Sequence, residues 1–386
     1  MATNLLNEAW ANLDSFELRL LLDERIGGPG QYSGRTGPLA YRNTLYLPLA
    51  GDSCRIVLTF RDKNIIVIKP GPAFDNGQWQ EICEQIENTI LSGPPKVGRE
   101  YSFSSFRVQG SWRGKHSGIQ ILPPPDDAPS AGVEMAEHPF ILEFPMQATN
   151  LWRITNHRRI RDHRNLTRLL NVLLAGGTSL QPLRWDHFWA LVPRDGDEFH
   201  VEWVQLFFYA KLGQVVVDQL SPPANQTLEE IEPEEYYTCV GHDGKGLRVP
   251  VNLDQSICHY LQLSQTNRVK FDRASFWMEM ASRLWNTSVS LTFASLVSAI
   301  ESMNNGRKDR KKKFIEFFEK YASDTALRCR RDDMYDLRSS ILHGSQLIQL
   351  DQDLAFGWDP PWQNEHELID QLSRLARIAL RNEHVP

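Results

Sequence analysis

The spacing of the apolar residues changes near Leu253, and this change is the strongest constraint on how the chain can fold. Up to about Pro250, short runs rich in β-branched and aromatic residues end at Gly, Pro or Asp, as is typical of strands joined by turns. Beyond Leu253 the apolar residues recur with the period of amphipathic helices. The pattern therefore predicts an α+β protein, with a β-rich mixed region over residues 1–250 and an all-α helical bundle over residues 251–386.

Within the first region, five segments have the composition of strands and two have that of helices. The run from Leu122 to Asp127 is rich in proline and leaves open a division into two subdomains near residues 125–135. The acidic run from Glu229 to Glu235 is expected to be a solvated connector. The predicted strands are 43–50, 54–60, 64–69, 138–144 and 200–209, and the predicted helices are 79–91 and 158–174.

The second region contains three clear apolar stripes and two further segments with a helical period. The short loop from Asn304 to Gly306 implies that the helices on either side of it are antiparallel neighbours, which indicates a bundle. The predicted helices are 271–285, 289–303, 314–321, 333–342 and 368–379.

Composition excludes several classes of protein. The net charge of −6 argues against a protein that covers nucleic acid with its whole surface. Because apolar runs are short and the first residues lack the features of a signal peptide, we expect a cytoplasmic protein that does not contact membranes. The five cysteines are scattered and form no C-x-x-C pair, so neither disulfides nor a zinc site are expected. Phosphate-loop and metalloprotease motifs do not occur, and we expect no cofactor and no metal.

The most informative segment is Met-Tyr-Asp-Leu-Arg-Ser-Ser-Ile-Leu-His-Gly at 334–344, whose apolar residues share one helical face. Arg338 and His343 lie about 140° apart around a continuous helix, so they cannot meet at one phosphate within it. Gly344 is a C-cap signal that places His343 at the helix end, where its ring can point elsewhere. One copy thus provides half a site, and two copies related by a two-fold axis would complete it.

Arginine and histidine suit RNA cleavage without a metal ion. A histidine can move a proton to or from the ribose 2′-hydroxyl or the leaving 5′-oxygen, and an arginine can hold the phosphate as its negative charge grows. The expected reaction is attack by the adjacent 2′-hydroxyl, which leaves a cyclic phosphate and excludes DNA as a substrate. The alternative is structural. Arg338 would then pair with a carboxylate such as Asp333, Asp336 or Glu301, and His343 would interact with the helix dipole.

The sequences MYDLRSSILHGS at 334–345 and LTFASLVSAIESM at 291–303 resemble the HEPN superfamily, most closely its ApeA-like branch, which is associated with bacterial anti-phage defence. The resemblance implies that Arg338 and His343 are the catalytic pair and that Ser339 occupies the polar position after the arginine. It also implies that Glu301 is the acidic residue that supports the site. HEPN toxins controlled by tyrosine modification carry a tyrosine where Ser345 stands here, so that mode of control is not expected.

Two basic segments are candidates for contact with nucleic acid. One run begins at Arg307 and shares the predicted bundle with the motif, where phosphate contacts would be useful, although a solvated helix start has the same composition. Residues 153–168 of the first region contain six arginines beside Trp152 and are a candidate surface for nucleic acid or a partner. The predicted RNA-binding residues are Arg307, Lys308, Lys311, Lys312, Lys313 and Arg330.

Together these patterns predict a metal-independent endoribonuclease that acts as a homodimer on an RNA substrate through Arg338 and His343. The resemblance implies a setting in bacterial defence. The first 250 residues would then sense a phage-derived or nucleic-acid trigger, or regulate the nuclease. Two alternatives belong to other classes. One is a non-catalytic dimerisation or adaptor module, and the other is a protein that binds a nucleotide signal.

Overall fold

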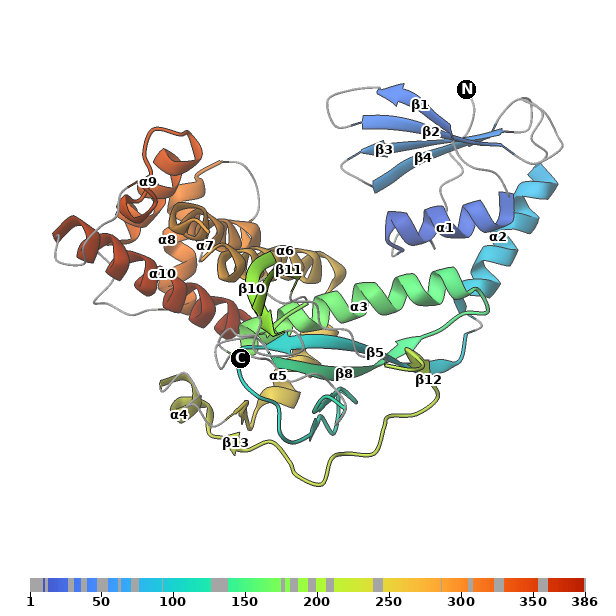
Figure 1. Cartoon of the computed structure of the whole chain (residues 1–386). Coiled ribbons are helices and arrows are strands. Elements are labelled where there is room, and N and C mark those ends of the chain that lie inside the picture. The colour runs from blue at the N-terminus through green and yellow to red at the C-terminus, as the bar shows by residue number, and fades with distance from the viewer. Residues whose placement is uncertain are drawn as a thin grey trace. The chain divides into compact units, whose positions relative to one another are not determined.

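The computed structural model of the chain is drawn in Figure 1. It describes residues 10, 13–26, 31–35, 40–46, 55–61, 64–70, 76–91, 93–125, 138–174, 178–180, 187–193, 199–205, 212–238, 246–285, 287–304, 308–322, 330–352 and 360–384.

The contacts within the chain group into two compact units. Unit 1 consists of residues 1–97 and 145–162, and unit 2 consists of residues 98–144 and 163–386. The division falls inside β5 (Pro95–Ser104), β8 (His138–Gln147) and α3 (Trp152–Leu173), each of which contributes residues to both units. Strands and helices are both present, and the helices concentrate towards the C-terminus, so the expectation of an α+β protein is confirmed.

Unit 1 is built on an antiparallel meander in the order β1-β2-β3-β4. α1 packs against α2 and β2 (Figure 1). Leu58 of β3 lies opposite Ile68 of β4, and both are fully buried in a core that also contains Leu21, Trp79 and Ile86. The elements are α1 (Ser15–Ile26), β1 (Gln31–Arg35), β2 (Ala40–Tyr46), β3 (Arg55–Arg61), β4 (Asn64–Pro70) and α2 (Asn76–Leu91).

The first half of the basic helix α3 faces carboxylates of α1 within unit 1. Arg158 is buried and forms an ion pair with Glu17, and Arg161 contacts both Glu17 and Asp14 at 3.0 and 3.1 Å. Burial opposes ionisation of Asp14, but hydrogen bonds from His157 and Arg161 hold the pKa of this carboxyl well below its usual range. The charges of Arg158 and Arg161 are therefore neutralised within unit 1, and the buried Arg158 cannot contribute to the candidate surface for nucleic acid or a partner. The surface formed by the remaining arginines stays a prediction.

Unit 2 contains a sheet in the order β12-β5-β8-β7-β6, with β9 paired to β5. The second half of α3 packs its leucines into this unit, and His163 hydrogen-bonds to Ser102 of β5 at 2.8 Å. Two-stranded pairs β10-β11 and β13-β14 complete the strands that the structure describes. The remaining strands and the short helix are β6 (Trp112–Arg113), β7 (Gln120–Leu122), β9 (Thr178–Ser179), β10 (His187–Pro193), β11 (Phe199–Gln205), β12 (Val216–Val217), β13 (Glu230–Ile231), α4 (Pro233–Thr238) and β14 (Val249–Pro250).

The helices after residue 250 pack around α7 (Figure 1), which contacts α6, α8, α9 and α10. Most α7 positions are apolar or small and are buried, as expected for a helix enclosed on several sides. Ser288 caps α7, because its Oγ accepts a hydrogen bond from the N–H of Leu291 at 3.2 Å. The helices are α5 (Leu253–Gln262), α6 (Gln265–Leu284), α7 (Val289–Met303), α8 (Arg310–Tyr321), α9 (Arg331–Leu342) and α10 (Pro360–His384), with the 3-10 turn η3 (Gln349–Asp351).

Polar contacts cross residue 250 inside unit 2. Asp254 in the first turn of α5 accepts hydrogen bonds from the N–H of His116 at 2.8 Å and the hydroxyl of Ser117 at 2.6 Å. Arg168 of α3 forms an ion pair with the buried Glu279 of α6 at 2.8 Å. The change from strands to helices thus occurs near residue 250 as expected, while unit 2 includes residues on both sides of it. The predicted division into domains 1–250 and 251–386 stays a prediction.

The predicted elements correspond closely to those observed in several places, with β4, β8, α2 and α7 the best examples. Other elements differ from the prediction. α3 begins at Trp152 rather than Arg158, and the acidic run 229–235 forms β13 and the start of α4 instead of a connector. The helices α1 and α5 were not anticipated, and α6 and α10 begin earlier than predicted. The proposed subdomain break near 125–135 falls mostly on residues 126–137, outside the described residues. In the described part of the chain, no helix is long and apolar enough to cross a membrane.

The segment after α9 is tied to the start of α7. The carboxylate of Asp351 accepts hydrogen bonds from the N–H groups of Val289 and Ser290 at 2.9 and 2.8 Å and from the hydroxyl of Ser288 at 2.8 Å. Partial burial opposes ionisation of Asp351, but these hydrogen bonds lower its pKa below the ordinary value of 3.8. A carboxylate at a helix N-terminus also interacts favourably with the helix dipole.

We predict that Asp351→Ala, which removes the accepting oxygens, destabilises the protein by about 0.5–2 kcal/mol at neutral pH, as the loss of a helix cap typically does. Because the folded-state pKa is depressed, the stabilisation is present above the unfolded-state pKa and is lost as the pH falls through the folded-state pKa. Denaturant unfolding of both proteins from pH 7 down to about pH 3 measures this. The difference between them should shrink at the acidic end, and a difference that stays constant over the whole range would contradict the assignment.

Candidate functional site

The C-terminal end of helix α9 has a backbone geometry that fixes the position of the His343 backbone. Gly344 has a φ of +71°, in the left-handed region that favours glycine. Its N–H donates to the carbonyl of Ile341, and the N–H of Ser345 donates to that of Ser340, both at 3.0 Å, which is the Schellman pattern. His343 is the C-cap residue, and its side chain is exposed. The sequence expectation of a glycine C-cap that leaves His343 at the helix end is confirmed.

Arg338 lies one turn earlier in a polar cluster between α7 and α9. It forms an ion pair with Glu301, and the hydroxyl of Tyr335 donates to the other oxygen of Glu301 at 3.1 Å. The Arg338 and Glu301 side chains are only 16% and 13% exposed. Nε of Arg338 has no hydrogen-bond partner among the described residues, so part of this guanidinium is not yet satisfied by the protein.

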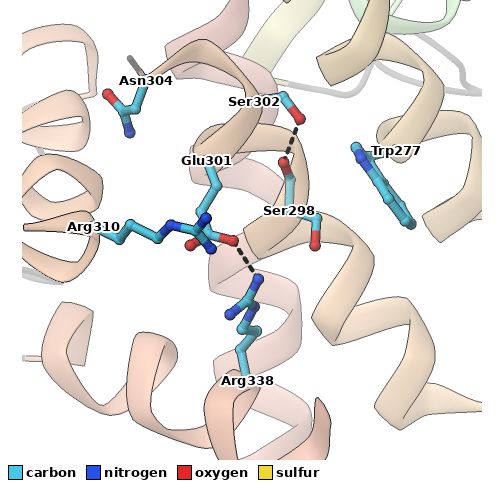
Figure 2. Close-up of a pocket in the computed structure, with 7 residues that line it drawn as sticks. All are labelled: Trp277, Ser298, Glu301, Ser302, Asn304, Arg310 and Arg338. Carbon is cyan, nitrogen blue, oxygen red and sulfur yellow. Dashed lines mark hydrogen bonds and ion pairs between the residues drawn. The ribbon is translucent and has the colours of Figure 1, made fainter. Parts of the chain in front are cut away.

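Arg338 and Glu301 line a pocket of about 290 Å³. Figure 2 shows Arg310 and Arg338 extending towards Glu301 from different helices, with the ring of Trp277 on the other side of the α7 residue Ser298. The lining comes from four helices and the residue that follows α7. The full set is Trp277 of α6, Ser298, Glu301 and Ser302 of α7, Asn304, Arg310 of α8 and Arg338 of α9.

The four predicted catalytic residues are not brought together within one chain. Arg338 and Glu301 are in contact, as the resemblance implies, but the same ion pair is what the structural alternative predicts. His343 is not among the pocket residues, which agrees with the expected angle of about 140° between it and Arg338. Ser339 is half-buried in α9, and its carbonyl accepts the N–H of His343 at 3.0 Å. Their catalytic roles stay predictions.

The predicted RNA-binding residues differ in their surroundings. Lys311 forms ion pairs with Asp332 and Asp336 at 3.0 and 2.8 Å, and Arg330 hydrogen-bonds to Asn364 of α10. The side chains of Lys311 and Arg330 are therefore already paired with carboxylates or amides of the protein. Lys312 is exposed and 3.7 Å from Glu316, Lys308 is exposed, Lys313 is half-buried in α8, and Arg307 lies outside the described residues.

Three residues near the site were not singled out in the sequence. Arg310 lies within the basic run but was not distinguished from its neighbours, although it lines the pocket with Arg338. A second, open pocket of about 700 Å³ between α8 and α9 also includes Arg310, together with Tyr335. Trp277 is an exposed aromatic residue on α6, and its place in the pocket depends on how α6 packs on α7. None of these positions has a motif that reveals such a long-range contact.

Metal ligands and cysteine thiols are two further kinds of candidate chemistry. No group of three or more His, Cys, Asp or Glu side chains in the described ranges could hold a metal ion. Burial, together with the nearby Glu87 and Glu84, raises the pKa of the Cys83 thiol to about 11, so this thiol is protonated at neutral pH. Cys258 is also unpaired, while Cys54, Cys239 and Cys329 lie outside the described residues.

Comparison with protein-family models, curated proteins and solved structures finds no match for this chain. The resemblance to HEPN domains therefore has the quoted motifs as its support.

The polar cluster makes a prediction for Tyr335. Burial raises its pKa, and the charge of Glu301 and the hydrogen bond to Glu301 raise it further. In Glu301→Gln the charge is removed, so the Tyr335 pKa should fall towards its ordinary value of 10.0. Carbon NMR of ring-labelled tyrosine follows the titration, and Tyr335→Phe identifies the signal. An unchanged midpoint in Glu301→Gln would mean that Tyr335 and Glu301 are not in contact.

Proposed function

We propose that this protein is a metal-independent endoribonuclease of the HEPN type, with Arg338 and His343 as its catalytic residues. The observation that carries the proposal is the arrangement on α9. This helix holds Arg338 in a polar pocket large enough for part of a nucleotide, and it presents His343 exposed at its C-terminal end. Neither side chain is among the buried residues of α9, which are Arg331, Met334 and Ile341.

The chemistry needs no redox partner. The 2′-oxygen of a ribose attacks the adjacent phosphorus, the bond from phosphorus to the 5′-oxygen breaks, and a 2′,3′-cyclic phosphate and a 5′-hydroxyl result. One proton leaves the 2′-hydroxyl and one reaches the 5′-oxygen. Histidine suits both transfers because it can be protonated or neutral near pH 7. Arg338 would hold the phosphate oxygens as their negative charge grows in the transition state.

A dimer can carry out the two proton transfers, one by a base and one by an acid, more readily than one chain. Arg338 and His343 lie about 140° apart around α9, so they do not face the same phosphate within one copy. One copy also contributes only one His343 to the reaction. In an isologous pair of helices, the same surface of both copies meets, and two arginines and two histidines can line one cleft. Leu342 precedes His343 in the sequence and Leu347 follows four residues after it. Their side chains are 51% and 46% exposed, as residues of such an interface would be in a single chain.

The ion pair between Arg338 and Glu301 favours a second candidate, a non-catalytic module in which the C-terminal helices only dimerise. In that case the pair serves to join α7 and α9. The two candidates differ in what Glu301 does. In the nuclease, Glu301 orients an arginine that also contacts RNA, whereas in the adaptor the ion pair is its whole role.

We predict that His343→Ala lowers the rate of RNA cleavage by about 100- to 10,000-fold, as the loss of a proton-transfer group does. Its stability should change by less than about 0.5 kcal/mol because the side chain is exposed. The matched control is His116→Ala, which removes another exposed histidine and should cleave normally. Cleavage is followed on labelled RNA and stability by thermal unfolding. Normal activity in His343→Ala would favour the adaptor.

Arg338 requires a variant that separates its two roles. Arg338→Lys keeps a positive charge beside Glu301 but cannot present a planar fork to a phosphate. We expect it to retain most of the folded stability while cleaving about 100- to 1,000-fold more slowly, as after loss of a transition-state donor. Arg374→Ala, at an exposed arginine of α10, is the control. If Arg338→Lys unfolds at a much lower temperature and loses no activity per folded molecule, the residue is structural.

The dimer is tested by light scattering at micromolar concentration. We expect the mass of two chains, because one chain carries half of the proposed site. A monomer with full cleavage activity would contradict this part of the proposal.

A further inference from the structure

The pocket at Arg338 holds more positive charge than the carboxylate in it can balance. Arg338 is paired with Glu301. Arg310 lines the same pocket and has no carboxylate within ion-pair distance in the part of the chain that the structure describes. Two guanidinium groups and one carboxylate leave a net positive charge at one end of the pocket. A phosphate group would neutralise it, since arginine forks match phosphate oxygens.

The other end of the pocket is aromatic. Trp277 is 36% exposed although it lies in the middle of α6, and it lines the pocket on the side away from Arg310 (Figure 2). One neighbour, Phe276, contacts it edge-on at a centroid distance of 5.3 Å, which leaves stacking surface for a ligand. An indole ring beside a cationic group is the combination by which proteins hold an unpaired nucleotide, with the base on the ring and the phosphate on the cation.

The wall between these ends offers hydrogen-bond acceptors. The hydroxyl of Ser298 donates to the carbonyl of Ala294 and that of Ser302 donates to the carbonyl of Ser298, both at 2.8 Å. Each hydroxyl hydrogen is therefore already used within α7, and the oxygen lone pairs that remain can only accept. Such a wall suits the N–H groups of an exocyclic amine and is unfavourable to a base edge with two carbonyls. Adenine, cytosine and guanine carry such an amine, while uracil does not.

We propose that this pocket binds one unpaired, amino-bearing nucleotide of the RNA, with its base on Trp277 and its phosphate contacted by the parts of Arg310 and Arg338 that Glu301 does not pair. The inference rests on the proposed nuclease function. It makes this pocket the site that recognises the base next to the cleaved bond. The pocket volume of about 290 Å³ is just below the usual range for ligand pockets, so the pocket can hold part of one nucleotide but not a base pair. Cleavage should accordingly be confined to single-stranded RNA.

The test measures binding apart from cleavage. The probe is a fluorescein-labelled hexamer of adenosine with 2′-fluoro sugars, which lacks the nucleophile and is not cut. Fluorescence anisotropy gives its affinity for the full chain. Trp277→Ala should weaken binding by about 5- to 140-fold, as the loss of one aromatic stack does. Trp277→Phe keeps a ring and should stay within a few-fold of the natural protein. The matching uridine hexamer should bind more weakly than the adenosine hexamer.

Trp285→Ala is the matched control, because Trp285 ends the same helix, is 38% exposed and does not line the pocket. It should bind like the natural protein. Equal binding by Trp277→Ala and Trp285→Ala would overturn the stacking site, and equal affinity for both hexamers would overturn the preference for an amino-bearing base. Absence of cleavage by a protein that binds the adenosine hexamer through Trp277 would count against the nuclease proposal and leave the binding site standing.

Discussion

The burial of α7 is the constraint on which the C-terminal helices depend. Residues such as Phe293, Leu296 and Ile300 are buried in contact with α6, α8, α9 and α10, so the helix cannot rotate without exposing a large apolar surface. That fixed rotation places Glu301 towards α9 and Ser298 towards α6. The polar pocket therefore exists because an apolar helix fixes the direction of a few polar side chains, and Arg338 is positioned by its ion pair with Glu301.

His343 is held by a different set of contacts. Gly344 ends α9 in a left-handed conformation, and Asp351 ties the following segment to the N-terminus of α7. Ile348, between them, is fully buried and donates its N–H to the hydroxyl of Ser290 at 2.8 Å. Both proposed catalytic side chains thus depend on α7, one through Glu301 near its C-terminal end and the other through its N-terminal cap. This shared support would keep their positions fixed relative to each other while leaving His343 open to RNA or to a second copy.

Features that depend on neighbouring residues in the sequence could be predicted from the sequence. The apolar period of α7 and the glycine after His343 are local signals, and both correspond to observed structure. Contacts between distant residues had no such signal. The carboxylates Asp14 and Glu17 that neutralise Arg158 and Arg161 lie more than a hundred residues away, so the sequence could not show that these two arginines are paired within the protein. Arg310 could not be distinguished from the other basic residues of its run, because only packing against α7 and α9 decides which of them faces the pocket.

The proposed function requires that the protein cleave RNA through the 2′-hydroxyl by means of its own side chains. The most direct measurement is to incubate the purified chain with single-stranded RNA in the presence of EDTA and to determine the fragment ends by mass spectrometry. The account predicts 2′,3′-cyclic phosphate and 5′-hydroxyl ends, and no cutting of DNA of the same sequence. Cleavage that stops in EDTA and returns with magnesium, or that leaves 5′-phosphate ends, would contradict it.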